Sequence, residues 1–576
     1  MVHITVPPPP LKPSFVELFT PKLVTVLREG YGLRQFRADA IAGLTVAIVA
    51  LPLSMAIAIA SGASPAQGLY TAIIGGFLVS ALGGSRFQIG GPAGAFIVLV
   101  AATVQQHGMD GLFLAVILSG ILLLALGLFR LGSYIRFIPY PVIIGFTAGI
   151  AIIIVASQLK DLLGLTLPGT EPGPLGEKLP FLWSAFDTVN LGAVGLALGT
   201  IATIAVFRRA LPKWPGLLIA VAAASVITAL FGLPVATIGS AFGGIPSSLP
   251  VPAFPEISLE RIGAVLPSAI GFALLGAIES LLSAVVADSM TGRRHRSNCE
   301  LAAQGVANVA SGLFGGISVT GTIARTATNV RAGAHGPVAG ILHAAFLLLF
   351  ILIAAPLASY IPLASLAGVL VVVAWNMVEK HAVIAFFRAS RGEAAVFVVT
   401  LALTVFRDLT EAIVVGLALG SLLFIHRMSK ATAVEAQGEA QWEDRADGDP
   451  ADRRPYDGAI AANPDVIVYR ISGALFFGAA ASIGSVLERI PETSRTLILD
   501  LSGVPFLDST GVQMIEGLAA KATRRGVKVV LTGTTHAGRR ELFAHGVKPP
   551  LVAYEPTIEQ ALAAAGMARA ASPAKA

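Results

Sequence analysis

The chain has 576 residues, of which 55% are hydrophobic and only 13% are charged, and its formal net charge is +6. Soluble domains carry roughly 25% charged residues, so this composition excludes an ordinary soluble enzyme and predicts that most of the chain lies in lipid. The net charge is too small for this length to indicate nucleic-acid binding, and the single cysteine, Cys299, excludes an intramolecular disulfide and a multi-cysteine metal site.

The chain opens with residues 1–38, a proline-rich and then charged segment without the features of a cleavable signal peptide. Apolar segments then recur from Asp39 to about Arg427, and a membrane-spanning helix needs about 20 mainly apolar residues. The first set of predicted spans lies near 39–60, 66–82, 91–105, 111–129, 137–158, 190–207 and 215–231. The second set lies near 261–287, 299–313, 321–332, 337–355, 363–378, 393–407 and 410–427. We therefore predict two transmembrane repeats, 39–235 and 236–430.

Lys and Arg residues gather in alternate loops of this arrangement, and the opposite loops are poor in both. Positive charge marks the cytoplasmic side of a membrane protein, so both termini are expected in the cytoplasm of a cell with a bacterial-type inner membrane. Because each set holds an odd number of spans, the second set must be inverted relative to the first. Inverted repeats are typical of secondary transporters.

Two stretches interrupt the apolar pattern, IGGPAGAFIV from Ile89 and GGISVTGTIART from Gly315. Each opens the third span of its set, and both spans are too short to cross a roughly 30 Å hydrocarbon core as helices. Non-helical backbone survives in a membrane only where protein or water surrounds it. A half-helix that begins after such a break presents free N–H groups and a positive dipole end, which favour an anion. The two stretches predict a two-sided anion pocket; kinked helices packed by small residues are the alternative.

Glu279 lies deep within the predicted span 261–287, where a carboxylate is costly and usually functional. Ser283 lies one helical turn further on the same face, and the two side chains together can hold a coupling proton or sodium ion. The alternative is a structural ion pair between Glu279 and Arg325. Arg325 itself either adds positive charge to the anion pocket or locks its short span in place.

The composition changes after Lys430. Residues 431–460 are polar and acidic, which predicts a linker, and residues 461–566 read as one cytoplasmic domain of alternating strands and helices, followed by a tail, 567–576. The expected strands are VIVYRI, TLILDL and VKVVLTG, and the expected helices are SIGSVLERI, GVQMIEGLAAKATRR, RRELFAHG and IEQALAAAG.

Three motifs in the membrane part resemble the SulP anion transporter family: DAIAGLTVAIVALPLSMAIAIASGASPAQGLY (39–70), GGPAGA, and SNCELAAQGVANVASGLFGGISVTGTIARTATN (297–329). DLSGVPFLDSTGVQMIEGL (500–518) resembles a STAS domain. The resemblance implies an α-helical polytopic membrane protein with fourteen spans, arranged as two inverted repeats of seven with two half-helices, plus a cytoplasmic α/β STAS domain. It also implies a core domain that moves against a gate domain, and a homodimer.

The resemblance further implies an anion held between the third and tenth half-helices, with contacts from the first span. The implied substrate-binding residues in this chain are Ser54, Ile57, Gly91, Pro92, Ala93, Gly94, Thr322, Ala324, Arg325 and Thr326. The first span departs from the family pattern Pro-Gln-Gly-x-Ala-[Tyr/Phe], because residues 52–57 read PLSMAI and lack the glutamine and the aromatic residue.

Two further positions follow from the resemblance. Glu279 matches an eighth-span acid, and in bicarbonate-transporting relatives this position resembles an aspartate that helps to bind sodium. Thr510 stands where the sigma-factor regulators that share the STAS fold are phosphorylated. The alternative role of this loop is to cap the following helix through Asp508 and Ser509.

These observations predict a secondary active transporter of small anions, coupled to a proton or sodium gradient. Sulfate is the first expected substrate, followed by bicarbonate and small dicarboxylates. An anion channel of the same architecture and a nucleobase carrier are the alternatives from other classes. No enzymatic activity, cofactor or metal other than a coupling sodium ion is expected, since no nucleophile–base pair or phosphate-binding loop stands out.

Overall fold

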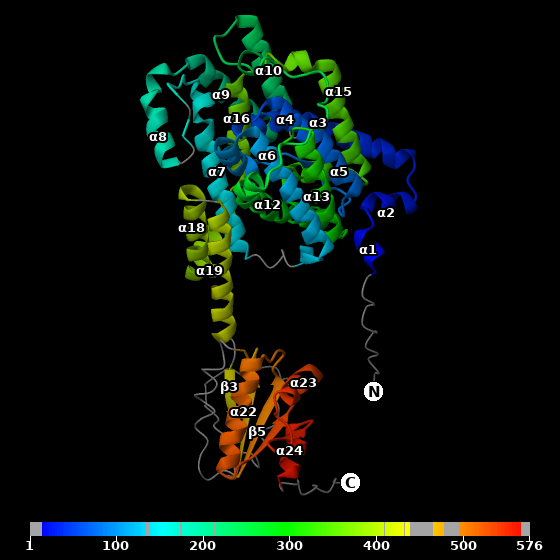
Figure 1. The fold of residues 1–576 in the computed structure, drawn as a ribbon, viewed down its shortest axis with the longest axis vertical. Helices are drawn as coiled ribbons and strands as arrows, with labels where there is room; N and C mark the ends of the chain where they lie inside the picture. Colours follow the sequence, from blue (N-terminus) through cyan, green and yellow to red (C-terminus); the bar gives the residue numbers. More distant parts are fainter. Residues whose placement is uncertain are drawn as a thin grey trace. The chain divides into compact units, whose positions relative to one another are not determined.

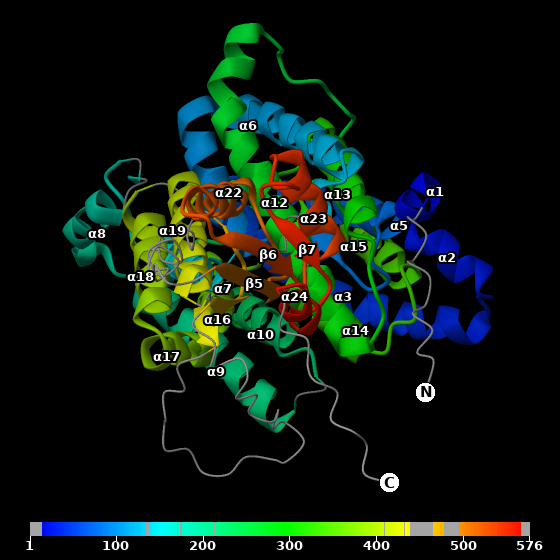
Figure 2. The same ribbon diagram turned by 90° about the horizontal axis from the view of Figure 1, so that it is seen from below.

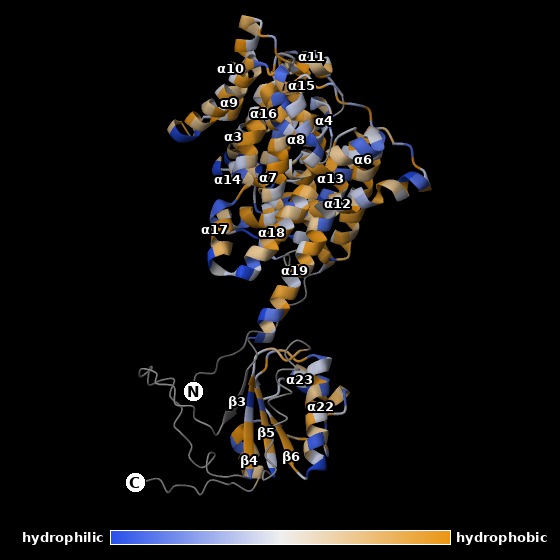
Figure 3. Ribbon diagram, turned by 90° about the vertical axis from the view of Figure 1, so that its left-hand side faces the viewer, coloured by the Kyte–Doolittle hydropathy of each residue, from blue (hydrophilic) through white to orange (hydrophobic). Residues whose placement is uncertain are grey.

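The computed structural model describes residues 14–133, 139–169, 171–172, 175–211, 214–407, 409–430, 433–437, 465–476 and 495–565. The chain divides into two compact units, Met1–Gly420 and Ser421–Ala576. In the part of the chain that the structure describes, nine helices are long and apolar enough to cross a membrane. The helices of the first unit are predominantly apolar, and polar residues concentrate near their ends (Figure 3).

The first half of the membrane unit contains ten α-helices and one short strand among the described residues. These elements are α1 (Phe15–Phe19), α2 (Lys22–Arg28), α3 (Leu33–Ala60), α4 (Pro65–Tyr70), α5 (Gly76–Leu82), β1 (Gly90–Gly91), α6 (Ile97–Leu128), α7 (Tyr140–Leu163), α8 (Leu175–Ser184), α9 (Leu191–Ala210) and α10 (Gly216–Phe231). A π-helical turn, η1 (Thr71–Gly75), joins α4 to α5, and a 3-10 turn, η2 (Gly94–Phe96), leads into α6. The left-handed backbone of Gly108, with φ 68°, divides α6 into two helical segments.

The second half of the membrane unit repeats this order, with a two-residue strand before a short helix. Its elements are α11 (Ile238–Phe242), α12 (Leu259–Thr291), α13 (Ser297–Leu313), β2 (Thr320–Gly321), α14 (Ile323–Arg331), α15 (Val338–Ala358), α16 (Leu363–Met377), α17 (Lys380–Ala389), α18 (Arg391–Phe406) and α19 (Leu409–Lys430). Each predicted apolar segment coincides with one of these helices or with half of α6, except the segment 66–82, which covers α4, η1 and α5. Sequence reasoning did not anticipate the short helices α1, α2, α8, α11 and α17.

The membrane helices form two packed groups (Figures 1 and 2). In the first, α12 and α13 pack on α6, and α15 packs on α3 and α5; we call α3–α6 and α12–α15 the core group. In the second, α16 and α18 pack on α7, and α9 packs on α10 and α16; we call α7, α9, α10, α16 and α18 the gate group. Small residues allow the closest packing: a Cβ on Gly120 of α6 would lie 2.6 Å from the Gly305 carbonyl oxygen of α13.

The second unit contains a five-stranded sheet in the order β3-β4-β5-β6-β7. Its strands are β3 (Ala433–Gln437), β4 (Val466–Ser472), β5 (Thr496–Gly503), β6 (Lys528–Thr532) and β7 (Ala553–Glu555), and its helices are α22 (Ser509–Arg524), α23 (His536–Ala544) and α24 (Ile558–Ala564). Strand β3 is antiparallel to β4, and the other neighbouring strands are parallel. The buried faces of β5 and β6 are lined by leucine, isoleucine and valine, against which α22 packs.

The edge strand β3 lies within residues 431–460, which the sequence predicted to be a linker. Part of that segment is therefore a strand of the sheet, because Ala433–Gln437 pairs with β4 along its whole length. The remaining residues of the predicted linker, the expected helix SIGSVLERI and the tail 567–576 lie outside the described residues.

Candidate anion site

The two interrupted stretches of the sequence meet in the structure. Strands β1 and β2 pair antiparallel, with Gly90 opposite Gly321 and Gly91 opposite Thr320. The Thr322 N–H extends this pairing by donating to the Ile89 carbonyl over 3.1 Å. Two segments about 230 residues apart are thereby fixed side by side, and each leads directly into a helix that begins inside the membrane unit.

Both helices that follow these strands begin without a side-chain cap. Ala93 precedes η2 and Thr322 precedes α14, and neither side chain accepts a hydrogen bond from the first turn. Thr322 is a good capping residue by type, but its hydroxyl lies 3.4 Å from the Ile89 carbonyl and donates to it instead. The first amides of each helix therefore keep their N–H groups available, together with the positive end of the helix dipole.

The predicted site residues on these two helix starts differ in exposure. Ala324 is exposed and Gly94 is half-buried, so both lie where a ligand can approach. Gly91, Pro92 and Ala93 are buried behind them. Ile57 of α3 is 2% exposed and belongs to the large apolar cluster that also contains Ala93.

Arg325 points into the core group and is only 1% exposed. Its Nη2 donates to the Ser54 hydroxyl over 3.2 Å and to the Pro92 carbonyl over 3.1 Å. These bonds join α3, the segment after β1 and α14, and they favour the locking role of Arg325. The positive charge nevertheless remains beside the two helix starts, and among the described residues no carboxylate lies within ion-pairing distance of it. The alternative ion pair with Glu279 is therefore not formed.

Thr326 connects three segments through its buried hydroxyl oxygen. It accepts a hydrogen bond from the Ile89 N–H over 3.1 Å and another from the Ser283 hydroxyl over 3.0 Å. Both bonds are internal, so Thr326 and Ser283 help to position α12, α14 and the segment before β1. The predicted roles of Thr326 as a substrate contact and of Ser283 beside the coupling ion stay predictions.

Glu279 of α12 is 9% exposed and lies one turn before Ser283. Within the described ranges its carboxylate has no hydrogen-bond or ion-pair partner. The neighbouring turn is tied to β2, because the Thr320 hydroxyl donates to the Gly276 carbonyl over 3.1 Å. Among the described residues, Glu279 is therefore a buried acid without a charged partner, on a helix that packs against α14.

Sequence reasoning missed two polar side chains that fix the broken segments. Thr320 binds the Gly276 carbonyl, and Asn329 Nδ2 donates to the Phe87 carbonyl over 2.9 Å. Both are buried. Their polar character within the membrane part of the chain was a usable signal, because a buried side chain of this kind needs a hydrogen-bond partner.

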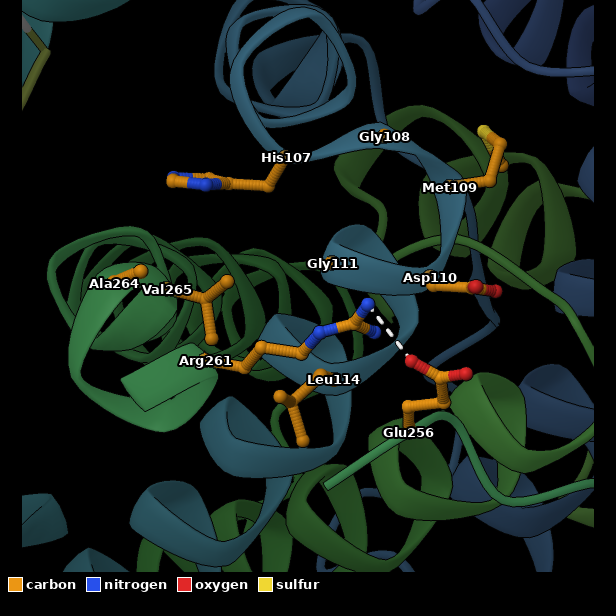
Figure 4. A pocket seen from close by; sticks show the side chains of 10 residues that line it. All are labelled: His107, Gly108, Met109, Asp110, Gly111, Leu114, Glu256, Arg261, Ala264 and Val265. Atoms are coloured by element: carbon orange, nitrogen blue, oxygen red, sulfur yellow. Dashed lines mark ion pairs between the residues drawn. The ribbon is translucent and has the colours of Figure 1, made fainter. Parts of the chain in front are cut away.

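A cavity of about 340 Å³ lies away from the helix starts, at the bend of α6 (Figure 4). It is lined by His107, Gly108, Met109, Asp110, Gly111, Leu114, Glu256, Arg261, Ala264 and Val265. The Arg261 guanidinium is ion-paired with Glu256 over 2.8 Å. His107 follows Gly94 by 13 residues, or about 20 Å of helix, so this cavity is separate from the candidate anion site.

In the second unit, the Asp508 carboxylate caps α22 by accepting from the Gly511 N–H over 2.8 Å, as the sequence analysis expected. Ser509 is the first residue of this helix, and Thr510 is exposed in its first turn. The exposed hydroxyl is accessible, and its phosphorylation stays a prediction.

Asp500, a buried residue in the middle of β5, is the centre of a polar cluster in the same unit. Its carboxylate accepts from Arg470 Nε over 2.8 Å and from the Ser502 hydroxyl over 2.9 Å, and the Thr532 hydroxyl donates to it over 3.3 Å. Burial alone would raise the pKa of Asp500, but the hydrogen bonds from Arg470 and Ser502 outweigh burial and hold the pKa below its ordinary value.

Comparisons with known proteins agree with this architecture. Residues 36–400 match the sulfate permease family and residues 459–565 match the STAS domain. A putative sulfate transporter of Bacillus subtilis, YvdB, is 40% identical over 522 residues, which cover 90% of this chain and 95% of that protein. The bicarbonate transporter BicA of Picosynechococcus is 32% identical over 88% of this chain and 90% of its own length.

Solved structures show the same fold. The transmembrane domain of a cyanobacterial BicA is 34% identical and covers 66% of this chain and 98% of its own, with a TM-score of 0.60. The structure of SLC26A9 covers 95% of this chain and 92% of its own, with a TM-score of 0.83 at 19% identity. The second likeness concerns the fold alone. On the extent of these matches, the chain belongs to the sulfate permease family, as a polytopic membrane anion transporter with a C-terminal STAS domain.

Proposed function

We propose that this chain is a secondary active transporter that carries small anions across a bacterial-type inner membrane, through movement of the core group relative to the gate group. The observation that supports this most is the pairing of β1 with β2, because it holds two uncapped helix starts together. Backbone N–H groups and two dipole ends can bind an anion there, and the proposed substrate-facing groups are the amides around Gly94 and Ala324.

Sulfate is the first proposed substrate, supported by the likeness to YvdB. Bicarbonate is the second candidate and small dicarboxylates the third. Bicarbonate remains a candidate substrate for a structural reason. Arg325 is turned into the core group, so the helix starts present backbone amides rather than the Arg325 guanidinium. Such a site suits a singly charged anion as well as a doubly charged one.

Glu279 is the proposed coupling group, either as a proton carrier or as a sodium ligand. Its support is its burial near α14 without a compensating charge. Protonation, or binding of a sodium ion, would remove the repulsion between this carboxylate and the anion. Loading of the anion and loading of the coupling ion would then favour each other.

The remaining proposals concern assembly and orientation. Both termini and the STAS domain lie in the cytoplasm, following the distribution of Lys and Arg in the loops. The protein forms a homodimer with fourteen spans per chain, as the family resemblance implies. Thr510 is a possible regulatory position, since its hydroxyl is exposed.

Uptake into proteoliposomes tests this function. Purified protein is supplied with labelled sulfate, bicarbonate or a dicarboxylate, with an imposed proton gradient, an imposed sodium gradient or neither. Accumulation of one anion against its own gradient, driven by one of the two cations, is expected. Flux that only ever runs downhill would reject coupling to either cation and leave a channel or an uncoupled carrier, and absence of flux for all these anions would reject the anion-transport proposal.

A further inference from the structure

The start of the third-span half-helix faces two apolar side chains of the gate group. A methyl group placed on Gly94 would lie 3.5 Å from Ile154 Cδ1 of α7 and 3.6 Å from Met377 Sδ of α16. Ile154 is fully buried, and Met377 packs against the same apolar cluster. On its Cβ side, Gly94 therefore lies within one methyl group of contact with these two side chains.

An anion that moves from the helix starts toward the gate group would lose the N–H groups that bind it. Neither the Ile154 methyl group nor the Met377 thioether has an N–H or O–H to donate, and an ion without compensating hydrogen bonds is costly to place in such surroundings. Apolar constrictions in membrane pores prevent ion passage for the same reason.

The two side chains differ in how they can follow a moving neighbour. Ile154 has a branched, stiff side chain, and it stands on a helix that packs closely on α16 and α18. Met377 is unbranched and fills changing gaps readily. A stiff residue beside an adaptable one can keep contact with Gly94 while the core group shifts.

We propose that Ile154 and Met377 form an apolar barrier that closes the anion pocket on its gate side, so that an anion enters or leaves only when the helix start at Gly94 moves past them. This inference rests on the proposed anion site. Ile154 and Met377 do not bind the anion themselves, and they determine whether transport is coupled or leaky.

The test is the double variant Ile154→Ala/Met377→Ala in proteoliposomes, using sulfate and bicarbonate as probes. Downhill leak is expected to rise about tenfold, because a modestly smaller dehydration barrier suffices for that change. Accumulation of the anion against its gradient should fall correspondingly. The anion dissociation constant, measured by calorimetry in detergent, should stay within about twofold of the wild-type value, because the backbone amides are unchanged. Ile152→Ala is the matched control: Ile152 is on the same helix and is 43% exposed, and its truncation should leave both fluxes unchanged.

Accumulation by the double variant at the wild-type level would contradict the barrier. Loss of anion binding by the double variant would also contradict it, because the two side chains would then contribute to binding. Failure of the wild-type protein itself to bind or move either anion would instead reject the proposed function. The single variant Met377→Leu, which conserves volume, provides a second measurement that does not depend on the double variant folding. It should restrict leak as the wild type does, whereas a leaky Met377→Leu would contradict a barrier based on apolar volume.

Discussion

The guanidinium of Arg325 lies against the backbone of Gly91, so closely that any side chain on Gly91 would overlap Nη1. The same guanidinium is held from the other direction by the Ser54 hydroxyl and the Pro92 carbonyl. The glycine in the third-span break is therefore required by the side chain of the opposite half-helix. The family resemblance implies that Gly91 contacts the substrate, which stays a prediction, and the packing of Arg325 gives a structural reason for its small size.

Gly91→Ala should displace Arg325 and lower the free energy of unfolding by about 1–3 kcal/mol, the usual cost of overpacking a filled interior. Thermal unfolding in detergent measures this effect. Gly94→Ala is the control, because a Cβ there would make only ordinary contacts at 3.5 and 3.6 Å. Equal melting temperatures for the two variants would contradict the packing of Arg325 on Gly91.

Thr326→Val should be strongly destabilising, although the two side chains have nearly the same shape. The substitution removes the acceptor of the Ile89 N–H and of the Ser283 hydroxyl, and each buried group left without a partner costs about 1–3 kcal/mol. Thr326→Ser keeps the oxygen and should retain most of the stability. If unfolding experiments ranked serine below valine, the hydroxyl would not be the connecting element.

Glu279→Gln should still bind the anion but lose accumulation against a gradient. Glutamine resembles the protonated acid in shape and charge, so it removes both the repulsion of the anion and the ability to exchange a proton or hold sodium. Binding is measured by calorimetry, and accumulation is measured in proteoliposomes with each cation gradient. Wild-type accumulation by this variant would assign Glu279 a structural role.

Asp500→Asn tests the polar cluster of the STAS domain through its pH dependence. Because the pKa of Asp500 is lower in the folded state, the ionised carboxylate stabilises the fold above the unfolded pKa of about 4. This contribution disappears as the pH falls through the lower folded value. Hydrogen–deuterium exchange of β5 in the full chain should show wild type better protected than the variant at neutral pH. That difference should shrink below about pH 4, and a difference independent of pH would contradict the charge-based account.

The main elements of the membrane fold were predictable because their signals are local. Long apolar segments must be helices in lipid, and the glycines and proline around Pro92 mark where a helix cannot continue. The pairing of Gly90 with Gly321 could not be predicted directly; the inversion of the two repeats indicated only that the two interrupted stretches form one pocket. In the second unit, alternating apolar strands identified β4, β5 and β6, whereas the short strand β3 looked like a linker because it lies within a polar and acidic segment of the sequence.

The roles of individual site residues were less predictable, because they depend on side-chain direction. The sequence showed that Arg325 is a cation near the start of a short span, but only the structure shows that it turns toward Ser54. In the same way, Thr326 and Ser283 have the polar groups of a binding site and use them on each other and on Ile89. Helix periodicity places residues on a face and does not say which partner a hydroxyl selects.

The central claim is that an anion binds at the uncapped starts of η2 and α14, and Ala324 gives the most direct test. Ala324 is exposed and is the second residue of α14, where a carboxylate is favoured by the helix dipole and should not harm folding. Calorimetric titration of sulfate and bicarbonate should show that Ala324→Glu weakens binding at least about 100-fold, because the tethered carboxylate occupies the same N–H groups. Ala324→Gln, of the same size without charge, should weaken it about tenfold or less. Equal affinities of the glutamate and glutamine variants would contradict an anion site between the two half-helices.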